Sequence, residues 1–146
     1  MGTTISLISS DGFQLSAYRA EPEGPAHGGI VVVQEIFGVN SHIRSVADRY
    51  AAAGFLAIAP AIFDRDRPGI ELGYTQDDMA AGRDIARGKL DFQNVLADVA
   101  AAGAAAAEAG KVGIVGYCYG GLVTAAAAKV SDALMAAEAA TSPPKQ

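Results

Sequence analysis

Alternation of apolar and polar residues opens the chain and predicts two β-strands. Residues 4–9 alternate, Asp11-Gly12 follows shortly after, and residues 13–18 alternate again. An Asp-Gly pair between two alternating runs is a strong signal for a β-hairpin. We therefore expect a hairpin at the start of the chain, followed by a loop rich in proline and glycine over residues 21–29.

Three short runs of apolar residues predict a second kind of strand. They cover residues 30–33, 55–59 and 112–115. An apolar run without alternation is typical of a strand that is covered on both faces, as in a parallel sheet. The run at 112–115 therefore predicts a central strand of the sheet.

Helical patterns separate these strands. Apolar positions from about His42 to Ala53 share one face, and Gly54 can end that helix. A second helical region begins at Asp77-Asp78, runs in one or two pieces to about Glu108 and ends at Gly110. A last helix is expected over 119–128, whereas residues 61–76 predict an irregular surface segment.

Strands that alternate with helices predict βαβ units and a parallel sheet. We expect an α/β fold with a doubly wound, mostly parallel sheet and an N-terminal hairpin. The pattern shows no internal repeat and no linker, so residues 1–146 are predicted to form a single, partial domain with an atypical C-terminal tail over 129–146.

Composition narrows the function classes. Hydrophobic residues make up 51% of the chain, but no uncharged run approaches the roughly 18 residues that a membrane span needs. The N-terminus lacks the basic region of a signal peptide, so a cytoplasmic, soluble protein is expected. A net charge of −5 argues against a nucleic-acid partner, and a single cysteine excludes an internal disulfide and a multi-cysteine metal site.

That cysteine lies in the segment that carries the chemistry, between the 112–115 strand and the 119–128 helix. Gly116-Tyr117-Cys118-Tyr119-Gly120 matches the Gly-x-Ser-x-Gly nucleophile elbow of α/β-hydrolases, with cysteine in place of serine. A nucleophile on so tight a turn has strained backbone angles and needs small neighbours two residues away on each side. The helix N-terminus beneath it favours a thiolate. The alternative is a buried structural cysteine beside a glycine-rich turn.

A second informative segment, Gln34–Asn40, follows the 30–33 strand. In α/β-hydrolases the loop after this strand donates one backbone N–H to the oxyanion hole, and the residue after the nucleophile donates the other. The corresponding amides here belong to Ile36 and Tyr119. Glu35 is expected near the elbow, and the alternative for Glu35 is an ion pair with an arginine such as Arg44.

Both segments together resemble the dienelactone hydrolase (carboxymethylenebutenolidase) family. The resemblance rests on Gln-Glu-Ile-Phe-Gly-Val-Asn from residue 34 and on Lys-Val-Gly-Ile-Val-Gly-Tyr-Cys-Tyr-Gly-Gly from residue 111. It implies a hydrolase that cleaves a lactone or an ester through a cysteine nucleophile, with Cys118 as nucleophile and Glu35 as acceptor of the thiol proton. Ile36 and Tyr119 would form the oxyanion hole. No metal or organic cofactor is implied.

The resemblance also indicates what is missing. The family places an acid and a histidine after the nucleophile, but no histidine follows Cys118, and we give neither His27 nor His42 a catalytic role. We expect a truncated form in which turnover is impaired and the edge of the 112–115 strand is exposed, inviting self-association. Two alternatives stay open: a non-catalytic α/β-hydrolase fragment, and a binding or assembly module that another chain completes.

Overall fold

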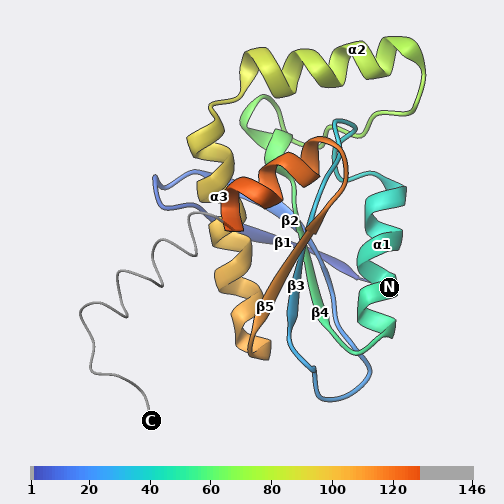
Figure 1. The fold of residues 1–146 in the computed structure, drawn as a ribbon, viewed down its shortest axis with the longest axis vertical. Helices are drawn as coiled ribbons and strands as arrows, with labels where there is room; N and C mark the ends of the chain where they lie inside the picture. The colour runs from blue at the N-terminus through green and yellow to red at the C-terminus, as the bar shows by residue number, and fades with distance from the viewer. Residues whose placement is uncertain (1, 129–146) are drawn as a thin grey trace.

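The computed structural model of the chain describes residues 2–128. Figure 1 shows five strands and the helical segments between and after them. They are β1 Thr3–Ile8, β2 Gln14–Ala20, β3 Gly29–Val33, α1 Ser41–Ala52, β4 Leu56–Pro60, η1 Ile62–Arg65, α2 Gln76–Asp84, η2 Ile85–Lys89, α3 Phe92–Ala106, η3 Ala107–Ala109 and β5 Val112–Gly116. Residues 119–128 are helical.

The five strands form one sheet in the order β1-β2-β4-β3-β5. The β1–β2 hairpin is confirmed: the strands are antiparallel, Leu7 pairs with Leu15, and Gly12 takes a positive φ of 88° in the turn. β3 is parallel to both β4 and β5, and only β2 runs against β4. The predicted mostly parallel arrangement of the last three strands is therefore correct.

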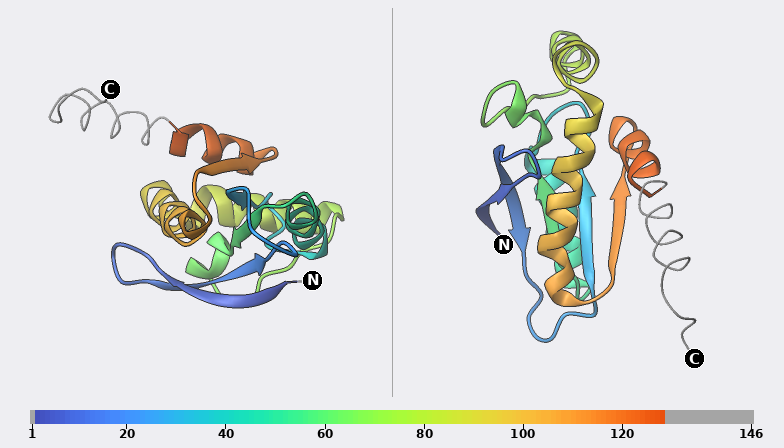
Figure 2. Two further views of the ribbon diagram at one scale, coloured as in Figure 1. Left: turned by 90° about the horizontal axis from the view of Figure 1, so that it is seen from below. Right: turned by 90° about the vertical axis from the view of Figure 1, so that its left-hand side faces the viewer.

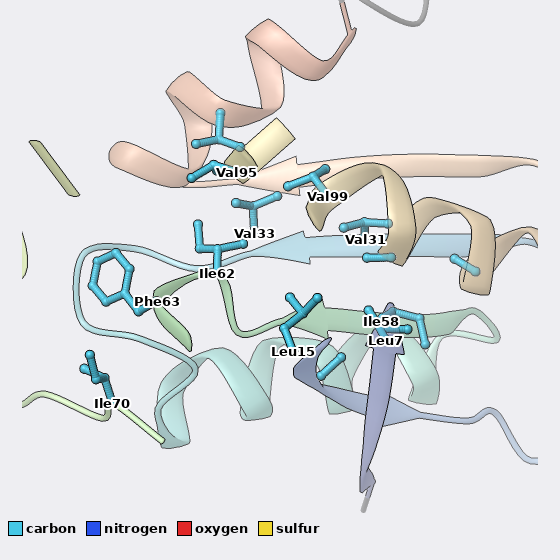
Figure 3. Packing of buried hydrophobic residues seen from close by; sticks show 14 of the residues in the cluster. Leu7, Leu15, Val31, Val33, Ile58, Ile62, Phe63, Ile70, Val95 and Val99 are labelled. Carbon is cyan, nitrogen blue, oxygen red and sulfur yellow. The ribbon is translucent and has the colours of Figure 1, made fainter. Parts of the chain in front are cut away.

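Helices cover both faces of the sheet. Val31 and Val33 of β3 belong to the hydrophobic cluster that contains Val95 and Val99 of α3 (Figure 3). Val32 points to the other face and packs in the cluster that α1 completes. Because successive side chains of a strand point to opposite faces, an all-apolar strand can serve both layers. Figure 2 shows α3 and α1 on opposite sides of the sheet, so the sheet is doubly wound, with helices on both faces.

The helical region between β4 and β5 consists of separate pieces, and its two α-helices each have a side-chain N-cap. The Thr75 hydroxyl accepts from the Asp78 N–H at the start of α2. The Asp91 carboxylate accepts from the Gln93 and Asn94 N–H groups at the start of α3. Cap residues of these types satisfy N–H groups that have no partner inside the helix. The helix predicted from residue 77 is therefore interrupted before α3.

The prediction of an irregular surface segment over residues 61–76 was wrong in part, because apolar residues between 62 and 70 are buried. Ile62 and Phe63 of η1 are fully buried, and Ile70 is nearly so. Gly38 forms an isolated β-bridge with Glu71, which ties this segment to the loop after β3. The Pro-Gly pair at 68–69 marks a turn, but it did not reveal that apolar residues on either side enter the core.

The 112–115 strand was predicted to be apolar on both faces with its outer edge exposed. Within the described residues the exposed edge is confirmed, whereas burial of the strand's two faces is not. β5 lies at the edge of the sheet and pairs only with β3. Val112 is 36% exposed, and the rest of β5 is exposed or half-buried. The apolar run therefore correctly predicted a parallel strand, but it did not predict how exposed that strand is in the described part of the chain.

Self-association through this edge stays a prediction. An edge strand offers unpaired N–H and C=O groups to another chain, and a lysine on the edge opposes such pairing. We expect the mass measured by light scattering to rise with protein concentration, and Val112→Lys to reduce that rise. Ile8→Lys, which changes an exposed residue of β1 at the opposite edge, is the matched control. A concentration-independent mass for the unchanged chain would contradict the prediction.

Candidate active site

Cys118 lies on a tight turn between β5 and the 119–128 helix. It is the only non-glycine residue with a positive φ in the described part of the chain, at 54°. The Gly120 N–H donates to the Tyr117 carbonyl at 2.9 Å, and the Leu122 N–H donates to the Cys118 carbonyl at 3.1 Å. A left-handed backbone costs a side-chain-bearing residue about 1–2 kcal/mol. Cys118 is exposed rather than buried, so the alternative of a buried structural cysteine was wrong.

Two glycines allow the turn to be this tight. A methyl group at Gly116 would collide with the Gly120 carbonyl and lie 2.7 Å from the Thr124 hydroxyl. A methyl group at Gly120 would lie 2.5 Å from the Val33 carbonyl oxygen and 2.6 Å from that of Gln34. The first turn of the helix therefore rests directly on the end of β3. These are the small neighbours that the sequence pattern led us to expect.

The loop after β3 reaches the same edge of the sheet. Val33 pairs with Gly116 in the parallel register, so Glu35 and Cys118 each lie two residues beyond paired positions. Adjacent strands are about 4.8 Å apart, and the two segments consequently leave the sheet side by side. In Figure 1 both leave at the end of the sheet over which α2 lies.

Glu35 is half-buried, and its carboxylate has no ion pair within residues 2–128. Arg44 instead binds Glu71 at 2.7 Å and donates to the Val39 carbonyl at 2.8 Å. The alternative that Glu35 serves as the partner of Arg44 was therefore wrong.

The amides of Ile36 and Tyr119 donate no hydrogen bond to another group in the described part of the chain. One belongs to the loop after β3 and the other to the first residue of the 119–128 helix. The Tyr119 phenol points into the core near Phe63, with ring centroids 6.5 Å apart, and burial raises its pKa. The phenol therefore stays neutral at ordinary pH, and its buried oxygen has no hydrogen-bond partner within residues 2–128.

Neither histidine lies in this arrangement. His27 precedes β3, at the opposite end of that strand from the Cys118 turn, and its ring contacts Phe55 edge-on. His42 is exposed in the first turn of α1. Among residues 2–128, no group of three or more histidine, cysteine, aspartate or glutamate side chains could hold a metal ion. Over the same residues, no helix has the length and apolar character to cross a membrane.

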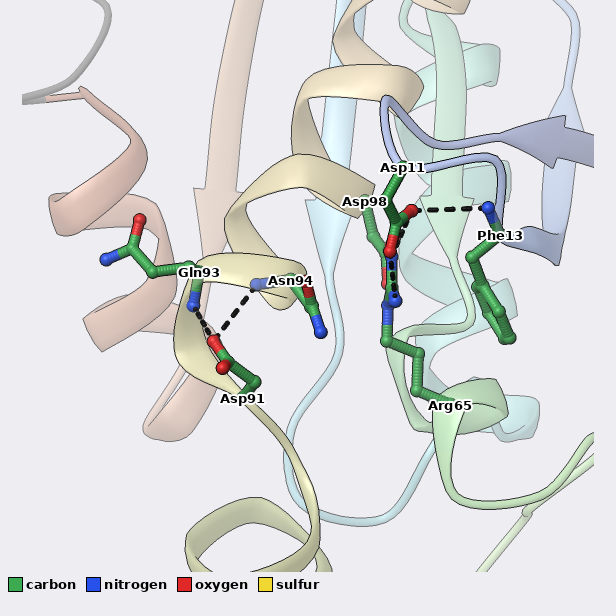
Figure 4. Close-up of polar contacts among 7 residues, drawn as sticks. All are labelled: Asp11, Phe13, Arg65, Asp91, Gln93, Asn94 and Asp98. Atoms are coloured by element: carbon green, nitrogen blue, oxygen red, sulfur yellow. Dashed lines mark hydrogen bonds and ion pairs between the residues drawn. The ribbon is translucent and has the colours of Figure 1, made fainter.

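Sequence reasoning missed an ionic cluster around Arg65, which joins the buried Asp98 of α3 to the exposed Asp11 of the hairpin turn (Figure 4). The guanidinium makes two hydrogen bonds to Asp98, at 2.8 and 2.9 Å, and two to Asp11, at 2.9 and 3.0 Å. It also lies 4.4 Å from the centre of the Phe13 ring. Asp98 is fully buried. An aspartate within the otherwise apolar face of α3 was the signal that could have revealed the cluster.

The family model described as "Dienelactone hydrolase family" matches residues 15–145. The chain belongs to this family. A Synechocystis protein provisionally named carboxymethylenebutenolidase is 40% identical over 127 residues, which cover 83% of this chain and 51% of the relative. An Escherichia coli relative with the same provisional name is 35% identical over 130 residues, or 82% of this chain and 45% of the relative.

A solved structure from Klebsiella pneumoniae, described provisionally as a dienelactone hydrolase, matches with a TM-score of 0.66 and 34% identity. The match covers 86% of this chain and 55% of that one. The chain thus spans about half the length of the family members it matches. Family membership and this structural match give the chain the α/β-hydrolase fold.

Proposed function

We propose that this chain carries the nucleophile and oxyanion part of a dienelactone hydrolase site, in which Cys118 attacks the carbonyl of a lactone or ester. The observation that carries the proposal is the left-handed backbone at Cys118, with an exposed thiol, directly between a strand and a helix. A strained residue is retained where the surrounding structure enforces it, and such residues cluster at active sites. The turn then acts as a nucleophile elbow.

The first half of the reaction needs only residues around this turn. The Cys118 thiol gives its proton to the Glu35 carboxylate, and the helix N-terminus favours the resulting thiolate. The sulfur attacks the carbonyl carbon, and the developing oxyanion accepts hydrogen bonds from the Ile36 and Tyr119 N–H groups. Collapse breaks the C–O bond of the ester, and the leaving oxygen takes the proton back from Glu35. The product is a thioester on Cys118.

The second half of the reaction is hydrolysis of that thioester by water. It requires a base to activate the water, and a histidine usually serves. The two histidines of this chain lie at positions 27 and 42, away from the turn in the described structure. We therefore propose efficient acylation followed by slow release.

The test is a pre-steady-state reaction with p-nitrophenyl acetate. We expect a burst of about one nitrophenolate per chain, an acetyl group on Cys118 by mass spectrometry, and little turnover after the burst. Cys118→Ala is expected to lose the burst and the adduct. Glu35→Gln is expected to slow acylation by about 100-fold or more, because the thiol proton loses its acceptor.

The outcomes separate the alternatives. An adduct on a residue other than Cys118, or an equal burst in Cys118→Ala, would contradict the thiol mechanism. Arg44→Gln serves as a control for Glu35→Gln, because it changes a nearby charged residue whose partner is Glu71. It is expected to leave the burst rate unchanged.

A further inference from the structure

Gln34, the residue directly after β3, is the most deeply buried amide side chain near the site. Its side chain has no exposed surface. The amide nitrogen Nε2 donates a hydrogen bond to the Glu35 backbone carbonyl at 2.9 Å. The amide oxygen Oε1 has no hydrogen-bond partner within the described residues.

Packing does not explain an amide at this position. A buried polar atom without a partner costs about 1–3 kcal/mol, and an apolar side chain of the same shape avoids that cost. Gln34 lines a cavity of about 180 Å³ together with the apolar residues Phe63 and Ile70 and with polar residues such as Arg44, Asp64 and Glu71, yet the hydrogen bond that its amide makes goes to the Glu35 carbonyl. The hydrogen bond to the Glu35 carbonyl is therefore the interaction that distinguishes glutamine from an apolar residue at this position.

That bond fixes the direction of the next N–H. The Glu35 carbonyl and the Ile36 N–H belong to one peptide group, which is planar and trans, so they point in opposite directions. Holding the carbonyl oxygen therefore aims the N–H. On the far side of Ile36, its own carbonyl lies against Gly82 of α2, where even a methyl group would collide with it. The peptide groups on both sides of Ile36 are thus held.

We propose that Gln34 is a positioning residue that orients the Ile36 N–H toward the oxyanion. The inference rests on the proposed function, because it assigns a task to an amide of that oxyanion hole. Preorganised donors stabilise the transition state because they need no reorientation during the reaction, and loss of one donor costs about 100- to 1000-fold in rate. A donor that is present but no longer aimed loses part of that effect.

Two reagents that act on the same thiol test this role. Acylation by p-nitrophenyl acetate develops an oxyanion, whereas alkylation by iodoacetamide does not. We expect Gln34→Met to slow acylation of Cys118 by about 10- to 100-fold and to leave its alkylation rate unchanged. Gln34→Leu, a second apolar replacement of similar size, is likewise expected to slow acylation and to leave the alkylation rate unchanged. Circular dichroism establishes that each variant is folded.

Val46→Ala is the matched control, since it truncates a buried residue of α1 on the opposite face of the sheet. It is expected to lower the free energy of unfolding and to leave the ratio of the acylation rate to the alkylation rate of Cys118 unchanged. Equal acylation in the unchanged chain and both Gln34 variants, or a parallel loss of acylation and alkylation, would overturn the role of Gln34 and leave the proposed function standing. Failure of the unchanged chain to acylate at Cys118 would overturn both.

Discussion

Replacing Arg65 with methionine is expected to lower the free energy of unfolding by about 3–5 kcal/mol, because it leaves a buried carboxylate without its cation. Arg65 is the bidentate partner of Asp98, which has no exposed surface. The hydrogen bonds to Asp98 and Asp11 raise the pKa of the guanidinium, so Arg65 carries its charge at any ordinary pH. The effect is measured by urea denaturation at neutral pH.

Two further variants show whether the charge is responsible. Lys89→Met removes an exposed lysine that lies 4.0 Å from Asp66, and exposed pairs of this kind contribute about 0–1 kcal/mol. Arg65→Met combined with Asp98→Leu is expected to recover most of the loss, because no unpaired charge remains in the core. An Arg65→Met variant as stable as the unchanged chain would show that Asp98 is not buried as described.

The same cluster gives the chain a defined acid sensitivity. The hydrogen bond from Arg65 lowers the pKa of Asp11 from 3.8 to about 2. Because the pKa in the folded state lies below that in the unfolded state, the Asp11 contribution is complete above about pH 4 and is lost as the pH falls toward 2. In Arg65→Met this part of the pH dependence is expected to disappear.

Gly120→Ala is expected to slow acylation of Cys118 by about 100-fold, because a displacement of about 1 Å in a reactive group has an effect of that size. The added methyl group would lie 2.5 and 2.6 Å from the backbone oxygens at the end of β3. Neither oxygen can move without moving the loop that holds Glu35 and Ile36. The helix must shift instead, with a loss of about 1–3 kcal/mol in stability.

The next residue provides the control. A methyl group at Gly121 would lie 3.4 Å from the Gly116 carbonyl oxygen, at the edge of ordinary contact. Gly121→Ala is therefore expected to leave the free energy of unfolding nearly unchanged. Its rate of acylation is expected to stay within a few-fold of the rate of the unchanged chain. Equal rates for the two alanine variants would contradict the close approach of the helix to β3.

Local patterns predicted the parts of the fold that local forces set. The Asp11-Gly12 turn, the capped helices and the apolar strands follow from residue spacing, and the Gly-x-Cys-x-Gly pattern located a turn whose backbone is left-handed at Cys118. Glu35 could be placed near that turn because parallel strands end at the same edge of a sheet. The placement of Glu35 relied in addition on the resemblance to α/β-hydrolases, because Glu35 and Cys118 are far apart in the sequence.

The remaining features depend on partners far away along the chain. Arg65 and Asp98 are 33 residues apart, and nothing near either residue marks the pair. Burial of Ile62 and Phe63 depends on α3 and the hairpin covering them. The exposed edge of β5 was expected from the family resemblance, because its apolar composition alone predicts a central strand. Gln34 was quoted within a motif, but its role appears only with its burial and its single hydrogen bond.

The central claim, that Cys118 is presented beside two oxyanion donors, is tested most directly by comparing its acylation with its alkylation. The ratio of the two rate constants for Cys118, with p-nitrophenyl acetate and iodoacetamide, is divided by the same ratio for N-acetylcysteine. Because thiol reactivity affects both reactions, it cancels in this quotient. What remains is the extent to which the protein stabilises the oxyanion that only acylation develops. We predict a quotient of about 100 or more. A quotient near unity would contradict the account.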